Sequence, residues 1–341
     1  MPHSHHVKIL FVCKKNHIYG QKMMATRRSS GLFNSTRFIV ESLREQGIRA
    51  AIVEVTDNND IDREVTKHRP DLVVIEALWV VPEKFPILKK HHPRVKWFVH
   101  LHSDMPFLAL EGNAIDWIVR SAKQGIGILA NSFESYEALS ILLTGCQLEL
   151  LPNVYRSEAR RAKLDDKVVA DIGCFGAVRP LKNHLLQAMA AIRFAREKKR
   201  FLRFHINVAR VETGGDPVLK NLRSLFQLTQ GTELCEHRWF EPDDFLDHLQ
   251  VKIDLGLQVS LSETFNVVTA DYVTAGLPVV VSKEVKWVDP RCWAIDNSVR
   301  DIVEKMHTVW HDRELVLHNQ ALLRQYAHKA TSAWVAFVQA H

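Results

Sequence analysis

The chain has few of the residues that stabilise small or fibrous proteins. Its 341 residues include five cysteines, 14 glycines and 12 prolines. The cysteines are far apart and form no Cys-x-x-Cys pair, which argues against a disulfide framework or a zinc-finger spacing. The low glycine and proline content excludes collagen and low-complexity disorder. We therefore expect reduced core thiols in a globular, cytoplasmic protein.

Long apolar runs are also missing. No run approaches the roughly 18 residues that a membrane-spanning helix needs. Residues 1–6 (MPHSHH) contain no apolar segment of the kind found in a secretory signal peptide. The sequence therefore predicts neither a transmembrane segment nor a signal peptide.

Negative charge is absent from the first 40 residues. The formal net charge of the whole chain is only +6. Residues 1–40 nevertheless hold seven lysines and arginines, and the first carboxylate is that of Glu41. A cationic segment of this kind favours an anionic partner.

Short apolar runs alternate with helical patterns along both halves of the chain. We expect strands near residues 7–13, 50–55, 71–76, 95–101, 126–130, 148–151, 168–174, 201–208, 254–259 and 277–282. This alternation predicts βαβ units and parallel sheets. The expected fold class is α/β, with two Rossmann-like doubly wound domains facing across a cleft. Such sheets bind ligands outside the carboxyl ends of their strands.

The first expected helix has sequence signals at both ends. Asn34 is expected to cap its N-terminus, with Phe33 and Phe38 as a hydrophobic staple. Gly47 is expected to end the helix at the C′ position.

The first candidate for chemistry is residues 173–183 (GCFGAVRPLKN), between a strand and a helix. Arg179 and Lys182 place two cations beside an expected helix N-terminus, where free N–H groups and the helix dipole also favour an anion. A guanidinium binds a pyrophosphate through two hydrogen bonds, and a lysine adds a point charge. The alternative is a solvated basic loop with no ligand.

The second candidate is residues 260–280 (SLSETFNVVTADYVTAGLPVV), which run from a strand through a loop and a short helix into the next strand. Glu263 lies in the loop and Asp271 lies eight residues later on the helix. Loop N–H groups hold phosphates or sugar hydroxyls, and a carboxylate suits the vicinal diol of a ribose. The alternative is a capped surface helix.

In this order and at this distance, the two segments resemble the GT-B fold glycosyltransferases, especially the retaining enzymes of glycosyltransferase family 4. That family has a glycine-rich loop with an arginine and a lysine, then an E-x7-E motif, then a GLPVV strand. The loop of this chain has Arg179 and Lys182. Its acidic motif has Glu263 and Asp271, and residues 276–280 are the GLPVV strand. The resemblance covers most of the chain. It departs from the family in having aspartate as the second acid, and in the shorter distance between the arginine and the lysine.

The resemblance implies a nucleotide diphosphate sugar donor, with UDP as the nucleotide and a hexose such as glucose as the sugar. Transfer would proceed with retention and without a metal. Arg179 and Lys182 would bind the diphosphate and stabilise the leaving nucleotide, where charge builds up. Asp271 would bind the ribose. The donor sugar would be held by Glu263 and the backbone amides of Thr264, Phe265 and Asn266.

The N-terminal half contributes three further residues by the same resemblance. His102 matches the family's histidine near the donor sugar, and Asp104 is a candidate base that orients the acceptor. Gly31 belongs to a small-residue turn near the donor phosphate. A core or loop histidine is the alternative for His102.

The resemblance also suggests the domain layout. Residues 154–167 are charged and poor in large apolar side chains, which predicts a linker. It would separate an acceptor-binding domain (1–153) from a nucleotide-sugar-binding domain (168–320). Residues 321–341 are expected to form a helix that packs back on the first domain.

The acceptor is expected to contact the loop after the first strand. Its basic residues are Lys14, Lys15, His17, Arg27 and Arg28. They favour a polyanion, and we expect DNA, with phage-type enzymes that glycosylate 5-hydroxymethyl pyrimidines as the analogy. A base of that kind would have to be flipped out of the duplex. Lipopolysaccharide, or another cell-envelope saccharide, remains the alternative acceptor.

Two other function classes stay open. A sugar-nucleotide epimerase shares the two-domain fold, but it would need its own acid and base and no polyanionic acceptor. A non-catalytic DNA-binding relative is also possible. The presence of Arg179, Lys182, Glu263 and His102 argues against it, because such a protein would not need them. A dehydrogenase is disfavoured, because no GxGxxG follows the first strand.

Overall fold

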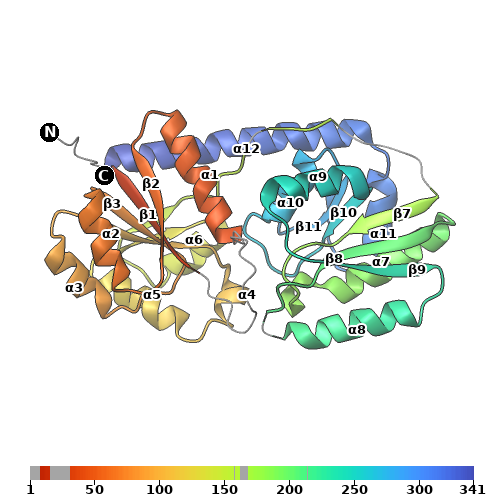
Figure 1. Ribbon diagram of the computed structural model, residues 1–341, viewed down its shortest axis with the longest axis horizontal. Coiled ribbons are helices and arrows are strands. Elements are labelled where there is room, and N and C mark those ends of the chain that lie inside the picture. Colours follow the sequence, from red (N-terminus) through yellow and green to blue (C-terminus); the bar gives the residue numbers. More distant parts are fainter. Residues whose placement is uncertain (1–7, 16–30, 157, 162–167, 213) are drawn as a thin grey trace. The chain divides into compact units, whose positions relative to one another are not determined.

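The computed structural model describes residues 8–15, 31–156, 158–161, 168–212 and 214–341. The chain divides into two compact units (Figure 1). Residues Met1–Arg156 and Ala327–His341 form the N-terminal unit, and Ser157–Tyr326 form the C-terminal unit. Each unit is described by itself below.

The N-terminal unit has one six-stranded parallel sheet, in the order β2-β1-β3-β4-β5-β6. Its strands are β1 (Ile9–Lys14), β2 (Ala50–Val55), β3 (Leu72–Glu76), β4 (Lys96–Leu101), β5 (Gly127–Ala130) and β6 (Leu148–Leu150). All six match the expected strands within two residues. Its helices are α1 (Gly31–Glu45), α2 (Asp60–His68), α3 (Lys84–His91), α4 (Met105–Leu108), α5 (Ala114–Lys123) and α6 (Phe133–Ser140).

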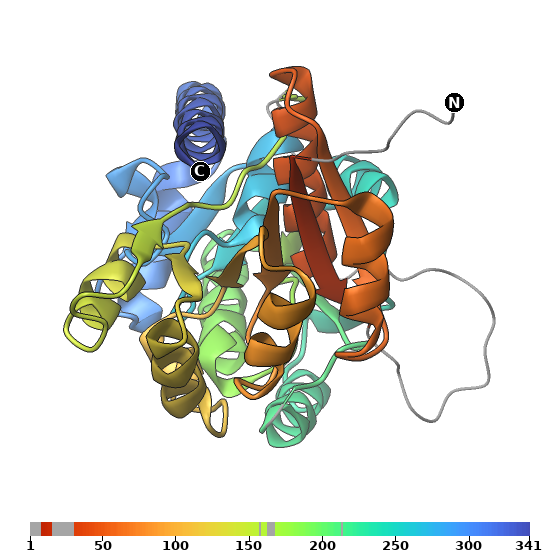
Figure 2. The same ribbon diagram turned by 90° about the vertical axis from the view of Figure 1, so that its left-hand side faces the viewer.

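The two faces of this sheet are covered by different helices. On one face, residues of β1, β3 and β4 pack with residues of α2, α3 and α5 in a single apolar core. On the other face, the ring of Phe11 lies 5.4 Å from that of Trp334, near the end of α12 (Arg313–Ala340). Figure 2 shows α12 end-on beside the sheet. The indole of Trp334 also donates a hydrogen bond to the carbonyl of Pro152, at 2.9 Å.

Helix α1 differs from its expected start. It begins at Gly31, so Asn34 lies inside the helix and is buried rather than capping it. The neighbouring Thr36 is buried as well, within hydrogen-bonding reach of Cys13 at the end of β1. This contact between Thr36 and Cys13 joins residues 23 positions apart, and the capping pattern does not show it. The expected end is confirmed, because Gly47 has a φ of 76° and the hydrogen bonds of a helix C-cap.

The C-terminal unit has a second six-stranded parallel sheet, in the order β12-β11-β10-β7-β8-β9. Its strands are β7 (Val169–Gly173), β8 (Phe201–Asn207), β9 (Thr232–His237), β10 (Leu255–Gln258), β11 (Val279–Ser282) and β12 (Trp293–Ala294). Its helices are α7 (His184–Glu197), α8 (Gly215–Gln227), α9 (Pro242–Lys252), α10 (Val267–Thr274) and α11 (Val299–Val309), with 3₁₀ turns η1 (Pro180–Lys182) and η2 (Pro290–Cys292).

Sequence patterns did not predict β9, α9 or β12. Charged and apolar residues mix in β9 (TELCEH), so it has no continuous apolar run. It lies at the edge of the sheet, where such a run is not required. Strand β12 has only two residues.

The strand order of the C-terminal unit reverses between β7 and β10. These neighbours pair in parallel, with Gly256 opposite Gly173. Both glycines face the Tyr272 side chain of α10. A Cβ atom at residue 256 would lie 2.4 Å from a carbon of that ring. Glycine therefore lets α10 lie directly on the two strands at the position where this fold type binds ligands.

Within the part of the chain that the structure describes, no helix is both long and apolar enough to cross a membrane. Helix α12 has 28 residues, but it does not meet that criterion.

Gly256→Ala should test the packing of α10 on the sheet. The added methyl overlaps a buried aromatic ring, and overpacking of this kind costs about 1–3 kcal/mol. We expect the thermal unfolding midpoint, followed by circular dichroism, to fall by about 4 °C or more. Gly31→Ala is the control, because no heavy atom of the described residues lies within 4 Å of its Cβ position. Equal midpoints for the two variants would contradict the packing argument.

Candidate functional site

The two candidate segments of the C-terminal unit lie side by side. Residues 173–183 follow β7 and residues 260–266 follow β10, its neighbour in the sheet. The amide of Leu261 donates to the carbonyl of Leu181 at 2.8 Å. The side-chain amide of Asn183 donates to the carbonyl of Val259 at 3.2 Å. The adjacent strands thus join both segments into one surface.

Two buried glutamines form hydrogen bonds at both segments. Gln187 donates to the carbonyl of Lys182 at 2.7 Å and accepts from the amide of Val259 at 2.8 Å. Gln258 donates to the carbonyl of Phe175 at 2.8 Å and accepts from the side chain of Asn266 at 3.0 Å. Each glutamine therefore fixes a position of both loops. Sequence reasoning missed both, although a glutamine in the buried strand β10 was an available signal.

Lys182 and Glu263, one from each candidate segment, form an ion pair. Their side chains are only 11% and 9% exposed. Removing one partner of such a pair leaves a poorly hydrated charge, at a cost of several kcal/mol. The pairing brings together two residues that the sequence analysis assigned to the diphosphate and the sugar.

Arg179 has a carboxylate partner that the sequence did not indicate. Its guanidinium donates to Glu212 at 2.6 Å, and Arg210 contacts the other oxygen of the same carboxylate at 2.6 Å. Burial opposes ionisation of Glu212, but Arg210 and Arg179 hold its pKa below the ordinary value. Glu212 thus remains a carboxylate, and it positions the predicted diphosphate-binding arginine.

A buried histidine begins the helix behind these cations. Burial, followed by the charges of Lys182 and Arg179, lowers the pKa of His184 to about 3. Neither of its ring nitrogens has a hydrogen-bond partner among the described residues. His184 is therefore neutral near pH 7, and the positive charge at this loop comes from lysine and arginine.

The loop after β10 is rigidly packed. Phe265 is buried, and its ring stacks on those of Trp287 and Tyr326 at 5.6 and 5.0 Å. Asn266 has a φ of 59° and caps α10 by accepting from the amide of Thr269 at 2.9 Å. These contacts anchor the backbone that follows Thr264. Asp271, the expected ribose ligand, is a buried residue of α10.

The N-terminal unit has a second polar cluster, at the ends of β3 and β4. His102 follows β4, and its Nε2 lies 2.5 Å from the buried carboxylate of Glu76. His100, inside β4, lies 3.2 Å from the same carboxylate and 3.1 Å from the carbonyl of Leu151. Both neighbours of His100 carry acceptor oxygens, so its two ring nitrogens are held between Glu76 and Leu151. The sequence analysis found His102 but missed Glu76.

The charges in this cluster are mutually dependent. Burial alone would raise the pKa of Glu76, but the neighbouring rings of His100 and His102 lower it to about 2. Burial and then the charge of His100 lower the pKa of His102. Glu76 therefore stays ionised and holds Nε2 of a neutral His102 by a hydrogen bond.

The other predicted residues of this unit are placed as follows. Asp104 caps α4, accepting from the amide of Met105 at 2.9 Å and from the hydroxyl of Ser135 at 3.0 Å. Gly31 is the first residue of α1. Lys14 and Lys15 are exposed at the end of β1. His17, Arg27 and Arg28 lie outside the described residues.

Glu76→Gln should reduce the acid sensitivity of the fold. The pKa of Glu76 is lower in the folded protein than in the unfolded chain, so its stabilisation is complete above the unfolded value and is lost as the pH falls. Between about pH 5.5 and about pH 3.5, we expect wild type to lose about 1 kcal/mol more unfolding free energy than the variant. Urea denaturation at both pH values measures this.

The control for this experiment is Glu54→Gln, which alters an exposed carboxylate of β2. It should retain the acid sensitivity of wild type. If Glu76→Gln retains it as well, Glu76 is not the ionised partner of the histidines.

The chain is similar to solved structures in its fold, but no sequence comparison gave a match. Neither a protein-family model nor a curated protein sequence matches the chain. The apo structure of OtsA aligns with a TM-score of 0.70 at 10% identity, over 97% of this chain and 98% of that one. A sucrose-phosphate synthase from Thermosynechococcus elongatus gives the same four values. The E. coli trehalose-6-phosphate structure bound with UDP-2-fluoro glucose has a TM-score of 0.66 at 10% identity, with the same coverage.

At this identity the similarity establishes the fold alone. The expected α/β class is confirmed, since each unit is built on a parallel six-stranded sheet. The arrangement of elements is that of the GT-B fold, with two Rossmann-like units.

Proposed function

We propose that this chain is a glycosyltransferase that binds a nucleotide diphosphate sugar on its C-terminal unit. One observation carries the proposal. Arg179, Lys182 and Glu263 gather at the carboxyl ends of β7 and β10, where the strand order reverses. Ligands of open α/β sheets bind at this position. The E. coli relative with the same fold is bound with UDP-2-fluoro glucose, which supports UDP as the nucleotide and a hexose as the sugar.

The proposed diphosphate site has more positive than negative side chains. Arg179, Arg210 and Lys182 face the two carboxylates of Glu212 and Glu263. A diphosphate competes with these carboxylates for the cations. The guanidinium is suited to bind two phosphate oxygens, and the ammonium group adds a point charge. As the glycosidic bond breaks, negative charge accumulates on the leaving diphosphate, and fixed cations lower that barrier.

The remaining assignments follow the family resemblance. Contact of the diphosphate with Lys182 frees Glu263 to accept hydrogen bonds from the sugar, together with the loop amides of residues 264–266. Asp271 binds the ribose. His102 contacts the sugar, and Asp104 orients the acceptor. We propose transfer with retention, as in glycosyltransferase family 4, and without a metal in the reaction.

Arg179→Ala should abolish sugar transfer while preserving the fold, because Glu212 keeps Arg210 as a partner. We expect turnover, measured by release of UDP from UDP-hexoses, to fall by at least about 100-fold. Calorimetry should show UDP binding weakened by about 10-fold or more, as for a lost hydrogen bond to a charged group. Arg193→Ala on the exposed face of α7 is the control.

Glu263→Gln tests whether sugar transfer needs the negative charge of Glu263. The amide still accepts a hydrogen bond from Lys182 but has no charge, so we expect transfer to fall by at least about 100-fold while UDP binding is retained. Near-wild-type rates in Arg179→Ala or Glu263→Gln would refute the site. Epimerised donor in place of transfer product would indicate a sugar-nucleotide epimerase instead.

For the acceptor we propose a polyanion, with a 5-hydroxymethyl pyrimidine in DNA as the first candidate. The proposal is supported by the absence of carboxylates from residues 1–40 and by the exposure of Lys14 and Lys15. The acceptor assay pairs each UDP-hexose with a 5-hydroxymethylcytosine duplex, an unmodified duplex or an anionic cell-envelope saccharide. Mass spectrometry of the digested products identifies the acceptor. Transfer to the saccharide alone would exclude DNA.

Replacing Lys14, Lys15, Arg27 and Arg28 by glutamine should weaken DNA binding and flatten its salt dependence. Each lost phosphate contact lowers the slope of log K against log salt by roughly one. Fluorescence anisotropy over a range of salt concentrations measures this. The control replaces Lys90 and Arg94, which are exposed cations of another segment. Equal slopes in the two variants would exclude the N-terminal segment from DNA binding. DNA binding without any donor turnover would favour a non-catalytic DNA-binding relative.

A further inference from the structure

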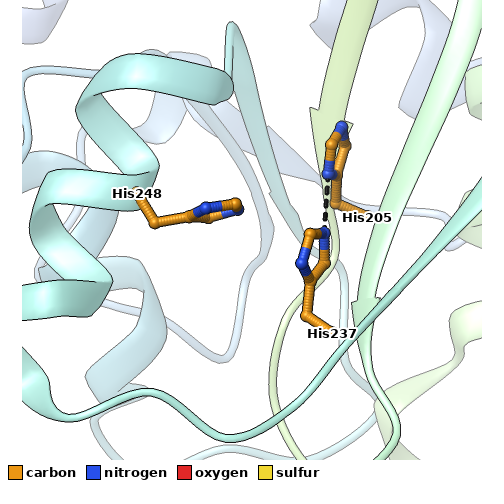
Figure 3. A group of neighbouring side chains, drawn as sticks. All are labelled: His205, His237 and His248. Carbon is orange, nitrogen blue, oxygen red and sulfur yellow. Dashed lines mark hydrogen bonds between the residues drawn. The ribbon is translucent and has the colours of Figure 1, made fainter.

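Three histidines from three elements of the C-terminal unit converge beside the sheet (Figure 3). His205 belongs to β8, His237 ends β9, and His248 belongs to α9. Each offers one ring nitrogen, and these three atoms lie within 4.8 Å of one another. The rings of His205 and His237 are nearly parallel, at 11°, while His248 points towards them from the helix. No sequence motif connects the three residues, because 32 positions separate the first two.

A carboxylate fixes the orientation of the central ring. Nε2 of His205 lies 3.0 Å from Oδ1 of Asp171 and donates a hydrogen bond to this carboxylate, which leaves Nδ1 facing the other histidines. Nδ1 faces Nε2 of His237 at 2.9 Å. Asp171 is itself oriented, since its backbone amide donates to the carboxylate of Asp254. A histidine that ligates a metal is typically held in this way, with its other nitrogen bonded to a carboxylate.

The surroundings of His237 and His248 favour neutral rings. The rings of Phe175 and Phe240 pack against it, at 5.6 Å from His237 and 4.7 Å from His248. Nε2 of His248 is buried and has no hydrogen-bond partner among the described residues. Burial and the neighbouring histidines lower the pKa of His237 to about 4. Neutral imidazoles are the form that binds metal ions.

We propose that His205, His237 and His248 bind a divalent transition-metal ion, with zinc as the best match. Imidazole nitrogens suit zinc and its neighbours in the first transition row, whereas magnesium and calcium prefer oxygen ligands. Zinc–nitrogen bonds of about 2.0–2.1 Å in a tetrahedron place the nitrogens roughly 3.4 Å apart. The three nitrogens, which lie within 4.8 Å of one another, would have to adjust to that separation when the ion binds. Water or another small ligand takes the fourth position.

The ion would cross-link β8, β9 and α9. This role is separate from the proposed sugar transfer, which uses no metal, so each proposal can fail without the other. The cluster lies against Phe175, a residue of the loop after β7. We therefore expect metal binding to raise the thermal stability of the protein.

The experiment uses untagged full-length protein in which His3, His5 and His6 are replaced by serine, because these residues could bind zinc independently. The protein is treated with a chelator, dialysed against zinc chloride, and analysed by elemental mass spectrometry. We expect one zinc ion per chain and a rise of several degrees in the unfolding midpoint. Cobalt(II) in place of zinc should give the visible absorption of a tetrahedral site. Magnesium should have no effect.

Two ligand variants, His237→Ala and His248→Ala, should each lose the bound zinc and the rise in midpoint. His328→Ala, which removes an exposed histidine, is the matched control and should retain both. Asp171→Asn keeps the three ligands and should weaken zinc binding by about 10–100-fold. It tests the proposal even if an alanine variant fails to fold. Absence of zinc from the background protein, or full retention of zinc by the His237→Ala/His248→Ala double variant, would overturn the proposal.

Discussion

The pairing of β7 with β10 is the constraint on which the candidate site depends. The chain segments that follow these strands are about 80 residues apart in sequence, yet the sheet holds Gly173 opposite Gly256. Tyr272 of α10 covers both glycines, so neither position has room for a side chain. Because the strands are parallel and adjacent, their following loops must emerge at the same edge. Backbone packing, rather than attraction between charges, therefore brings Lys182 to Glu263.

The two cations of this loop, Arg179 and Lys182, are each paired with a carboxylate. A charged group with little solvent access requires a counter-charge, and Lys182 and Arg179 each have a carboxylate. Replacing such pairs by apolar side chains is often neutral or stabilising, so fold stability alone does not account for them. The proposed diphosphate site would give these cations a role in binding. In the structure the carboxylates of Glu212 and Glu263 neutralise these cations, and in the proposal phosphate oxygens take their place.

Sequence patterns predicted the structural elements that are determined by residues close together in the chain. Apolar runs located the central strands, and the glycine at position 47 marked the end of α1 through its positive φ. Residues whose role depends on a distant partner could not be predicted in this way. Glu212 and Glu76 are single carboxylates in unremarkable segments, and only the fold places them beside arginine or histidine. The Asn34 prediction was wrong because α1 begins at Gly31, which places Asn34 inside the helix.

The loop after β7 joins the candidate donor site to the histidine cluster. The carbonyl of Phe175 is held by Gln258 of β10, while its ring packs on His237. The next residue, Gly176, donates its amide to Asn207 at the end of β8. The loop is thus anchored on one side by the strand that positions Glu263 and on the other by the strands that carry two of the histidines. The Phe175 ring lies 5.6 Å from that of His237, so the loop that leads to Arg179 packs against the histidine cluster. The geometry of the proposed diphosphate site therefore depends on the packing of both strand neighbours of β7.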